Sequence, residues 1–447
     1  MSPETPTDVD ILVIGAGAAG MMAAGSAACA GARVLLVEKT DQCGKKILVS
    51  GKTRCNLTNS AELTQFISMY GPNGRFLHSA FSVFFRDELL ALLEKQGLAT
   101  KVERGGRIFP LSDNSQDVVQ ALGKYMAESR VRVTFNRAVR AIVPEGSARF
   151  TVRCAAGDIR ATCVIVATGG ASWPATGSTG DGYEMAKALG HTIVPLKPAL
   201  VPLIVTEAEL ARSMQGVSLR NVRATAFSST AAEADESLVP SCDSGRGEKK
   251  KPRPPVLESR FGEMIFTHFG LGGPIILLMS QAVARALDVG PVSILIDLKP
   301  ALGRDQLSRR LIADLDRFGK RKIGSILKEY LPAKLIEPLR TLAGIDADSR
   351  AHQIDAAARE RIIDLFKALR FNITGTLPLS RAIVTAGGVH LKQVDPRTMA
   401  SRIQPGLFFC GEVLDLDADT GGYNLQAAFS TGFVAGQSAA QYALRHP

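Results

Sequence analysis

The sequence predicts an α/β fold in which a parallel βαβ unit opens the chain and a large insert separates two parts of one domain. Three features of the 447 residues support this prediction. Apolar runs of strand length alternate with helical patterns at first, β-type alternation follows after about residue 195, and a helical pattern fills residues 303–371. Hydrophobic residues make up 46% and charged residues 21%, which is typical of a globular chain with an ample core.

The amino-terminal elements follow from their hydrophobic patterns. Asp8–Ile14 and Arg33–Val37 are apolar runs that predict buried strands, and the small residues of Ala18–Ala30 predict a helix between them. Later patterns predict, in chain order, a helix near Phe81–Lys95, a helix over Asp117–Glu128, a strand over Val131–Phe135, antiparallel strands within Val139–Cys154 and a buried strand over Cys163–Ala167.

The composition changes in the second half of the chain. Leu196–Phe227 has short alternating runs that predict β structure, whereas Ser228–Pro255 buries little apolar surface and predicts a solvated loop. Strand patterns return from Ala382, and the small residues of Gly421–Tyr442 predict a closing helix. We therefore expect a first part of the main domain at 1–195, a β-rich insert at 196–302 with a flexible loop at 228–255, a helical insert at 303–371, a return strand at 372–381 and a second part of the main domain at 382–447.

Cysteine content, charge and hydropathy narrow the class of protein. Seven cysteines without Cys-x-x-Cys spacing and only six histidines argue against a disulfide framework and a zinc site, so we expect a reducing, cytoplasmic location and no metal. The net charge of +10 is modest for this length and does not favour a nucleic-acid partner. Ile11–Ala32 is uncharged and long enough to span a bilayer, but its glycines and alanines favour a buried strand, turn and helix, so we expect no membrane association.

The motif Gly15-Ala16-Gly17-Ala18-Ala19-Gly20 lies between the first expected strand and helix. Gly15 permits a tight turn, Gly17 lets a diphosphate approach the backbone, and Gly20 lets the helix pack closely on the strand. Free N–H groups and the helix dipole attract phosphate at such a helix start. Glu38 follows the second strand, where its carboxylate can accept hydrogen bonds from both ribose hydroxyls and would repel a 2′-phosphate. The motif therefore predicts a dinucleotide site that disfavours NADP.

Two further segments indicate an extended cofactor. Gly44 through Asn56 brings cations and small polar residues after the βαβ unit. Its Gly51-Lys52-Thr53 lacks the glycine spacing of a P-loop, which excludes that kind of ATP site. Near the carboxyl end, Thr420–Gln426 opens the last helix with two glycines and offers a second set of unpaired N–H donors. A cofactor held by the first motif would bring its other end to this turn, where N–H groups would stabilise the N1/C2=O edge of a reduced flavin.

These residues resemble the BaiN-like family of FAD-dependent oxidoreductases, which includes aminoacetone oxidase-like flavoproteins. The motifs of the resemblance span nearly the whole chain: Gly15–Gly20, Ser50-Gly51 with Arg54-Cys55-Asn56, Gly106–Pro110, Ala167–Gly170 with Ser172 and Pro174, Gly177–Gly182, Thr267–Gly270 with Gly273-Pro274, and Gly411-Glu412 through Asn424. The resemblance implies a Rossmann-like FAD domain of the two-dinucleotide-binding type, split by an inserted β-rich and helical domain. The chain departs from the family in two places. The family usually has small residues where this chain has Lys52-Thr53, and the loop at 228–255 is longer than the family's hairpin requires.

A set of cofactor-binding residues follows from the glycine motif and from the family's contacts. We expect FAD to contact Gly15, Ala16, Gly17, Gly20, Glu38, Lys39, Lys45, Ser50, Gly51, Asn56, Val139, Gly169, Gly411, Glu412, Asn424 and Leu425. The sequence identifies no catalytic acid or base. His268, before a glycine cluster, and Tyr423, beside Asn424, are the side chains considered for substrate contact, with a structural role as the alternative for each.

The resemblance implies hydride transfer through flavin N5. The reaction would either reduce an activated C=C bond of a small molecule or oxidise a small amine, and NAD(P)H as reductant would bind without a second Rossmann motif. One alternative is a fumarate-reductase-like enzyme, indicated by Thr385–Gly388 and Gly180-Asp181-Gly182 but lacking the Arg cluster that such an enzyme needs. Another is an RNA-associated flavoprotein, indicated by the basic run Lys320-Arg321-Lys322, although acidic residues are interleaved throughout the helical insert.

Overall fold

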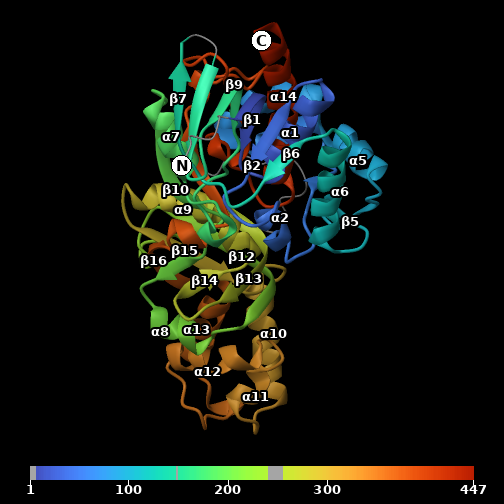
Figure 1. Cartoon of the computed structure of the whole chain (residues 1–447). Helices are drawn as coiled ribbons and strands as arrows, with labels where there is room; N and C mark the ends of the chain where they lie inside the picture. The colour runs from blue at the N-terminus through green and yellow to red at the C-terminus, as the bar shows by residue number, and fades with distance from the viewer. Residues whose placement is uncertain (1–6, 147–148, 240–254, 447) are drawn as a thin grey trace. The chain divides into compact units, whose positions relative to one another are not determined.

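The computed structural model describes residues 7–146, 149–239 and 255–446, which belong to two compact units (Figure 1). Unit 1 comprises the chain up to Lys197 and from Leu379 onward, and unit 2 comprises Pro198–Pro378. Each unit has its own buried hydrophobic core. Unit 1 is therefore one folded body made from two separate stretches of the chain.

A seven-stranded sheet forms the centre of unit 1. Its order is β6-β2-β1-β9-β8-β7, and β18 pairs with β9 outside this path. The pairs of β1 with β2, β1 with β9, β2 with β6 and β9 with β18 are parallel, whereas β7, β8 and β9 pair antiparallel. The strands are β1 (Thr7–Ile14), β2 (Val34–Val37), β6 (Arg132–Thr134), β7 (Val139–Glu145), β8 (Arg149–Cys154), β9 (Ile159–Val166) and β18 (Leu407–Phe409).

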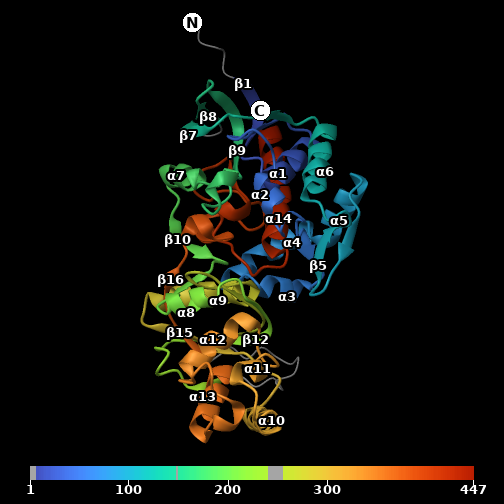
Figure 2. The same ribbon diagram turned by 90° about the horizontal axis from the view of Figure 1, so that it is seen from below.

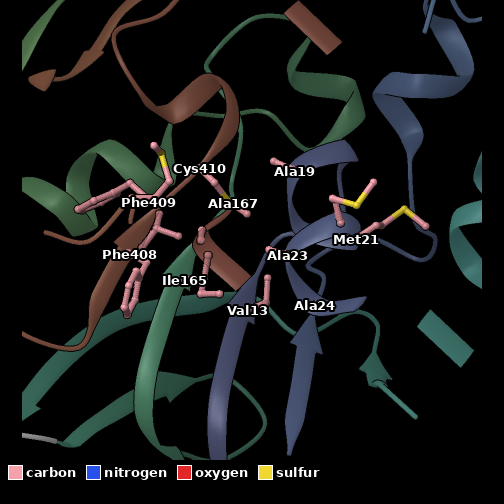
Figure 3. Packing of buried hydrophobic residues seen from close by; sticks show 14 of the residues in the cluster. Val13, Ala19, Met21, Ala23, Ala24, Ile165, Ala167, Phe408, Phe409 and Cys410 are labelled. Atoms are coloured by element: carbon pink, nitrogen blue, oxygen red, sulfur yellow. The ribbon is translucent and has the colours of Figure 1, made fainter. Parts of the chain in front are cut away.

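One edge of β9 is shared by two strands from different parts of the chain. Residues 159–161 of β9 pair with β8, whereas residues 164–166 pair with β18. Figure 3 shows the side chains of Val13, Ile165 and Phe408, one from each of the neighbouring strands β1, β9 and β18, packed in the core. The chain therefore completes its first sheet only after the insert, which is the physical basis of the split domain.

Helices and two small sheets complete unit 1. Both views show α1 and α14 side by side (Figure 1, Figure 2). The helices are α1 (Ala18–Cys29), α2 (Lys45–Val49), α3 (Leu63–Ser68), α4 (His78–Val83), α5 (Arg86–Lys95), α6 (Ser115–Glu128), α7 (Asp181–Ala188) and α14 (Tyr423–Arg445). The small sheets join β3 (Thr58–Asn59) and β4 (Thr100–Val102) to β5 (Arg107–Pro110), and β10 (Ile193–Ala199) to β17 (Val384–Val389).

The prediction of one continuous helix near Phe81–Lys95 is wrong. Phe84 and Phe85 adopt extended backbone conformations between α4 and α5. Glu88 Oε2 accepts a hydrogen bond from Phe85 N at 2.9 Å, which caps the second helix. The apolar periodicity continues through the break because Phe81 of α4 and Leu89 and Leu93 of α5 belong to the same core.

Unit 2 is built on a closed six-stranded barrel of order β11-β14-β13-β12-β15-β16. Its strands are β11 (Leu203–Val205), β12 (Ser218–Phe227), β13 (Val256–Phe266), β14 (Gly270–Gly272), β15 (Val292–Asp297) and β16 (Leu369–Thr376). Its helices are α8 (Ala208–Ser213), α9 (Pro274–Leu287), α10 (Arg304–Arg317), α11 (Ile323–Leu327), α12 (Ala333–Leu342) and α13 (Ala356–Lys367). The division into a β-rich part, a helical part and a return strand remains a prediction.

Only part of the segment expected as a solvated loop, 228–255, is described. Within it, Ala231 and Ala234 are buried, and Arg370 Nη1 donates hydrogen bonds to their carbonyl oxygens at 2.6 and 3.0 Å. Residues 240–254 lie outside the described residues. The described part preceding them therefore packs on the barrel rather than extending into solvent.

Three expectations drawn from composition concern the described residues. None of the described helices combines the length and the apolar character that a bilayer span requires. The six described cysteines carry free thiols. The described part of the chain contains no cluster of three or more His, Cys, Asp or Glu that could hold a metal ion.

His191 is a buried imidazole whose protonation the fold opposes. Its Nδ1 lies 3.2 Å from the Ala186 carbonyl oxygen, which can only accept, and its Nε2 lies 2.8 Å from Ser401 Oγ. Ser401 Oγ already accepts hydrogen bonds from the N–H groups of Ile403 and Gln404, so its own proton is directed to Nε2. Burial lowers the pKa of His191 below its usual value.

The stability of unit 1 should therefore decrease in mild acid. The unfolded chain binds a proton at this histidine below about pH 6.5. The folded chain, in which the pKa of His191 is lowered, binds that proton only at a lower pH. We expect the free energy of unfolding to fall as the pH is lowered from about 7.5 to about 5, and His191→Gln to flatten this dependence. Urea unfolding of both proteins at several pH values measures the effect. Equal slopes would contradict a neutral, buried imidazole.

Candidate cofactor site

The turn between β1 and α1 leaves an open, uncapped helix start. Gly15 has φ +100, and a Cβ there would lie 2.7 Å from the Ala167 carbonyl oxygen, while a Cβ at Gly20 would lie 1.8 Å from the Gly15 carbonyl oxygen. Gly17 differs, because its φ of −77 is ordinary and a Cβ there would meet nothing within 4 Å. No side chain caps α1, so its first N–H groups face this open space. A diphosphate would fit where a side chain at Gly17 would otherwise stand.

Glu38 follows β2 and is tied to the same turn. Its Oε2 accepts a hydrogen bond from Ala16 N at 2.8 Å, and its Oε1 accepts one from Thr40 N at 2.8 Å. Its backbone N–H donates to the Thr134 carbonyl oxygen of β6 at 2.9 Å. Each carboxylate oxygen keeps a further lone pair, so Glu38 can still accept from ribose hydroxyls.

Lys39 connects this region to the segment before α7. Its Nζ lies 2.6 Å from Asp181 Oδ2 and also donates to Thr179 Oγ1. Burial would raise the pKa of Asp181, but hydrogen bonds from Lys39 and Thr179 and the charge of Lys39 outweigh burial and lower it. A Cβ at Gly177 would lie 3.8 Å from Glu38 Oε1, so this segment lies beside the Glu38 carboxylate.

Val139 and Gly169 lie on the same side of the site. Val139 begins β7, and two residues before it Arg137 N donates to the Glu38 carbonyl oxygen at 2.9 Å. Gly169 has φ +75, and a Cβ there would lie 3.2 Å from Ser178 Oγ. The structure therefore groups both residues with the α1 end of the site, and their contact with FAD remains a prediction.

Two adjacent lysines at the start of α2 point in different directions. Lys45 Nζ pairs with the exposed Asp41 at 2.6 Å, whereas Lys46 Nζ lies 2.6 Å from Glu412 Oε2 and 2.8 Å from Ser172 Oγ. Neighbouring residues on a helix are rotated by about 100° around its axis. Lys45 was expected at the site and Lys46 was not, because two lysines in a row do not show which one turns inward.

Glu412 joins segments that are far apart in the sequence. Its Oε1 accepts hydrogen bonds from Thr385 N at 2.9 Å and from Ser172 Oγ at 3.2 Å, while Oε2 binds Lys46. Thr385 Oγ1 in turn accepts from the N–H groups of Ala171 at 2.9 Å and Ser172 at 3.1 Å. The Glu412 carboxylate therefore holds the walls of the site together. Ser172 and Thr385 were missed as site residues because their partners lie up to 240 residues away.

The helices α1 and α14 meet with almost no side chain between them. A Cβ at Gly432 would lie 2.4 Å from the Ala19 carbonyl oxygen, and a Cβ at Gly436 would lie 2.3 Å from that of Ala23. The contacts advance by four residues on both helices, so the helices are parallel. α14 begins at Tyr423, nine residues before Gly432, and α1 begins one residue before Ala19. At 1.5 Å per residue, the amino-terminal end of α14 therefore extends about 12 Å past the amino-terminal end of α1.

Gly411 lies where these two helices approach each other. Its φ is +76, and a Cβ there would lie 2.7 Å from Ala19 Cβ. Its N–H donates to Thr431 Oγ1 of α14 at 3.0 Å. Gly411 therefore lies beside the start of α1 and against α14 about two turns into that helix.

The start of α14 is a second uncapped helix N-terminus. Gly422 precedes the helix with φ +94, and a Cβ there would lie 2.4 Å from the Thr58 carbonyl oxygen. Asn56 Oδ1 accepts a hydrogen bond from Gly422 N at 3.0 Å, in the amide orientation that lets its nitrogen donate to the carbonyl oxygens of Thr58 and Ile108. No side chain caps the first N–H groups of α14.

The side chains in the first turn of α14 are engaged by the fold. Asn424 Oδ1 accepts from Ala418 N at 2.9 Å, and its Nδ2 donates to the Ala418 carbonyl oxygen at 2.9 Å. Tyr423 is buried, with its ring centroid 4.6 Å from that of Phe66, so it serves packing. Leu425 is half-buried. The backbone N–H groups of this turn are thus its groups suited to a cofactor. His268 is exposed and belongs to unit 2.

The loop Ser50–Asn56 carries an unusual run of left-handed residues. Ser50 Oγ donates to the Ile47 carbonyl oxygen at 2.7 Å. A left-handed conformation costs a residue with a side chain about 1–2 kcal/mol, so surrounding contacts must stabilise the loop. A Cβ at Gly51 would lie 3.0 Å from Asn56 N, which places the run against the residue that binds the start of α14. The residues with φ between 57° and 67° are Gly51, Lys52, Thr53 and Cys55.

These features fit an extended dinucleotide that carries a flavin ring. The N–H groups of α1 and the open space at Gly17 suit a diphosphate, and Glu38 suits a ribose. The N–H groups of α14, about 12 Å further along a parallel helix, suit the electron-accepting edge of the ring. The donors and the carboxylate are therefore arranged in the order that FAD requires.

Comparisons with known proteins place the chain in a family. The chain matches the family described as HI0933-like protein Rossmann domain over residues 9–438. It is 32% identical over 432 residues to the 3-dehydro-bile acid delta(4,6)-reductase of Clostridium scindens, covering 96% of this chain and 98% of that protein. It is 29% identical over 431 residues to the ribosomal RNA dihydrouridine synthase of Escherichia coli, covering 96% of this chain and 97% of that protein.

A solved structure is similar in fold over nearly the whole length. The 3-ketosteroid-delta4-(5alpha)-dehydrogenase of Rhodococcus jostii is 14% identical, with a TM-score of 0.45, and the similarity covers 98% of each chain. The family match confirms the resemblance found in the sequence, the Rossmann-like fold class with an inserted domain, and the cofactor FAD. The chain belongs to the HI0933-like family and is an FAD-dependent oxidoreductase.

Proposed function

We propose that this oxidoreductase reduces a carbon–carbon double bond conjugated to a carbonyl group in a small molecule. The observation that carries the proposal is that relatives with different names match more than nine-tenths of the chain and share one kind of product. The name of the bile-acid enzyme describes reduction of double bonds at positions 4 and 6 of a 3-keto compound. The name of the RNA enzyme describes formation of dihydrouridine, in which the uracil C5=C6 bond is saturated. In both, the double bond is conjugated to a carbonyl group.

The geometry of unit 1 is suited to this chemistry. Bound FAD would supply a hydride at N5 of its ring. The N–H groups at the start of α14 would stabilise negative charge at the ring's N1/C2=O edge, while those of α1 would hold the diphosphate. Glu38 would orient the ribose, and the contact of Lys46 with Glu412 would keep α2 in place beside the site.

The direction of hydride transfer and the identity of the reductant are part of the proposal. NAD(P)H would reduce the enzyme by docking without a Rossmann motif of its own, since the sequence has one such motif at Gly15–Gly20. Oxidation of a small amine by O2 is the other reaction that the resemblance implies, and it would run in the opposite direction. A cytoplasmic location, inferred from the cysteine usage, remains a prediction.

A second candidate is reduction of uridine in RNA. It is favoured by 29% identity to the ribosomal RNA dihydrouridine synthases of Escherichia coli and Haemophilus influenzae and by the basic run Lys320-Arg321-Lys322. RNA retention that weakens steeply with salt would support this candidate, and its absence at low salt would remove it. Exposed basic residues of the helical part of unit 2 that could contribute are Arg309, Arg310, Arg317, Lys320, Arg321 and Lys328.

Gly17→Val should weaken FAD binding, because the valine side chain would fill the space left for the diphosphate. Gly123 of α6 also has open space for a Cβ and a negative φ, so Gly123→Val is a matched control. We expect binding to be weaker by about tenfold or more for Gly17→Val, equivalent to about 1.4 kcal/mol, and unchanged for Gly123→Val. Flavin absorbance per protein after desalting, with titration of added FAD, measures both. Equal flavin binding in all three proteins would place the diphosphate elsewhere.

The reaction class can be tested with the reduced holoprotein. NADH or NADPH is added without oxygen until the flavin absorbance is bleached, and 2-cyclohexen-1-one is then mixed in. We expect the absorbance to return and cyclohexanone to form. Cyclohexene, whose double bond is isolated, is the matched control and should not reoxidise the flavin.

Other outcomes of this experiment separate the alternatives. Reoxidation by fumarate in place of the enone would favour a fumarate-reductase-like enzyme. Bleaching of the oxidised protein by a small amine, followed by reoxidation with O2 alone, would favour amine oxidation. Either result without enone turnover would contradict the proposed function.

A further inference from the structure

The loop Ser50–Asn56 contains a left-handed turn that hydrogen bonds hold in place. Gly51, Lys52 and Thr53 follow one another in left-handed conformations, and Arg54 N donates to the Gly51 carbonyl oxygen at 3.3 Å. The Thr53 carbonyl oxygen accepts from the N–H of Ser115, the first residue of α6, at 2.9 Å. Lys52 and Thr53 are exposed. The turn therefore presents two side chains to solvent in a conformation that favours glycine.

Arg54 clamps the turn to the sheet of β4 and β5. Its guanidinium makes a two-pronged contact with Glu103 at 2.9 and 3.0 Å, and Nη1 contacts Asp113 at 3.1 Å. It also lies 4.1 Å from the centroid of the Phe109 ring. Lys101 Nζ pairs with Asp113 at 2.5 Å. The carboxylates of Glu103 and Asp113 are thus paired with Arg54 and Lys101.

The groups of the turn that remain free are hydrogen-bond donors. Among the described residues, the N–H groups of Gly51, Lys52 and Thr53 have no hydrogen-bond partner, and the Lys52 ammonium makes no ion pair. The Thr53 hydroxyl donates to the Lys52 carbonyl oxygen at 2.5 Å. Successive N–H groups in such a turn form a nest for a negatively charged oxygen, and an ammonium group can only donate. The turn therefore suits an oxygen atom that gains negative charge.

The turn lies next to the expected position of the flavin ring. A Cβ at Gly51 would lie 3.0 Å from Asn56 N, and Asn56 Oδ1 accepts from Gly422 N at 3.0 Å. Gly422 precedes the first residue of α14, whose N–H groups suit the ring edge. Asn56 thus contacts both the donor turn and the residue that precedes α14.

We propose that Lys52 and the N–H groups of its turn bind the carbonyl oxygen of the unsaturated substrate and stabilise its enolate. The inference rests on the proposed function, in which a hydride from reduced FAD forms a C–H bond at the β carbon. The C=C electron pair then moves to the bond between the α carbon and the carbonyl carbon, and the C=O π pair moves to oxygen. A proton from water adds to the α carbon and restores the carbonyl. FAD is left oxidised, and NAD(P)H supplies the next hydride.

The test adds 4-chlorophenol, a stable mimic of the enolate, to the oxidised holoprotein. A phenolate that stacks on oxidised flavin gives a long-wavelength charge-transfer band, so binding is measured without turnover. We expect wild type to bind phenolate, and Lys52→Met and Lys52→Gly to bind it about tenfold more weakly. Lys124→Met, which removes an exposed lysine of α6, should bind it like wild type. FAD content should be unchanged in all variants.

Lys52→Gly keeps the test independent of folding defects. Glycine adopts the left-handed conformation without strain, so this variant should melt at a higher temperature than wild type while losing phenolate affinity. With 2-cyclohexen-1-one, both Lys52 variants should lower the rate of flavin reoxidation without changing the rate of reduction by NAD(P)H.

The outcomes distinguish this inference from the proposed function. Unchanged phenolate affinity in both Lys52 variants, or lost FAD in either, would overturn the assignment of Lys52 to the substrate. So would rapid enone turnover by a wild-type protein that binds no phenolate. Phenolate binding that depends on Lys52, without any enone turnover, would support the oxyanion site and refute the proposed substrate class.

Discussion

The parallel contact between α1 and α14 is the constraint on which the cofactor site depends. The two backbones touch because Gly432 and Gly436 have no Cβ where the carbonyl groups of Ala19 and Ala23 press against them. Parallel packing places the positive ends of two helix dipoles on the same side of the molecule, which is unfavourable by itself. An anionic cofactor that reaches both helix starts offsets this repulsion, so the same contact that costs stability in the empty fold contributes to affinity for FAD.

The insert separates the two halves of unit 1 in sequence but not in its sheet. β9 has eight residues, and its one edge accommodates β8 along the first half and β18 along the second. The chain leaves β18 directly into Gly411 and Glu412, which contact α1 and bind Lys46. A sheet edge with room for two short strands is thus what allows a domain to be interrupted and still complete one site.

Lys52 and Thr53, beside the proposed ring position, adopt left-handed backbone conformations that residues with side chains disfavour. Reduction of a conjugated double bond develops negative charge on the carbonyl oxygen, while the flavin cycle places negative charge on the ring. The chain offers separate donors for these charges, in the left-handed turn and at the start of α14. Strain that is held in place by a clamp such as the ion pair of Arg54 with Glu103 is typical of functional sites, because the geometry is then ready before the reaction begins.

The glycine motif, the βαβ unit, Glu38 and the two glycine-started helices could be determined from the sequence alone, because each depends on residues close together in the chain. The tertiary structure alone decided that Lys46 rather than Lys45 binds Glu412, that Ser172 and Thr385 join them, and that the Asn424 side chain clamps its own loop. It also decided that α4 and α5 are separate helices. The contacts of Glu412 depend on partners up to 366 residues away and on rotation about the axis of α2. A pattern of residue types along the chain specifies neither.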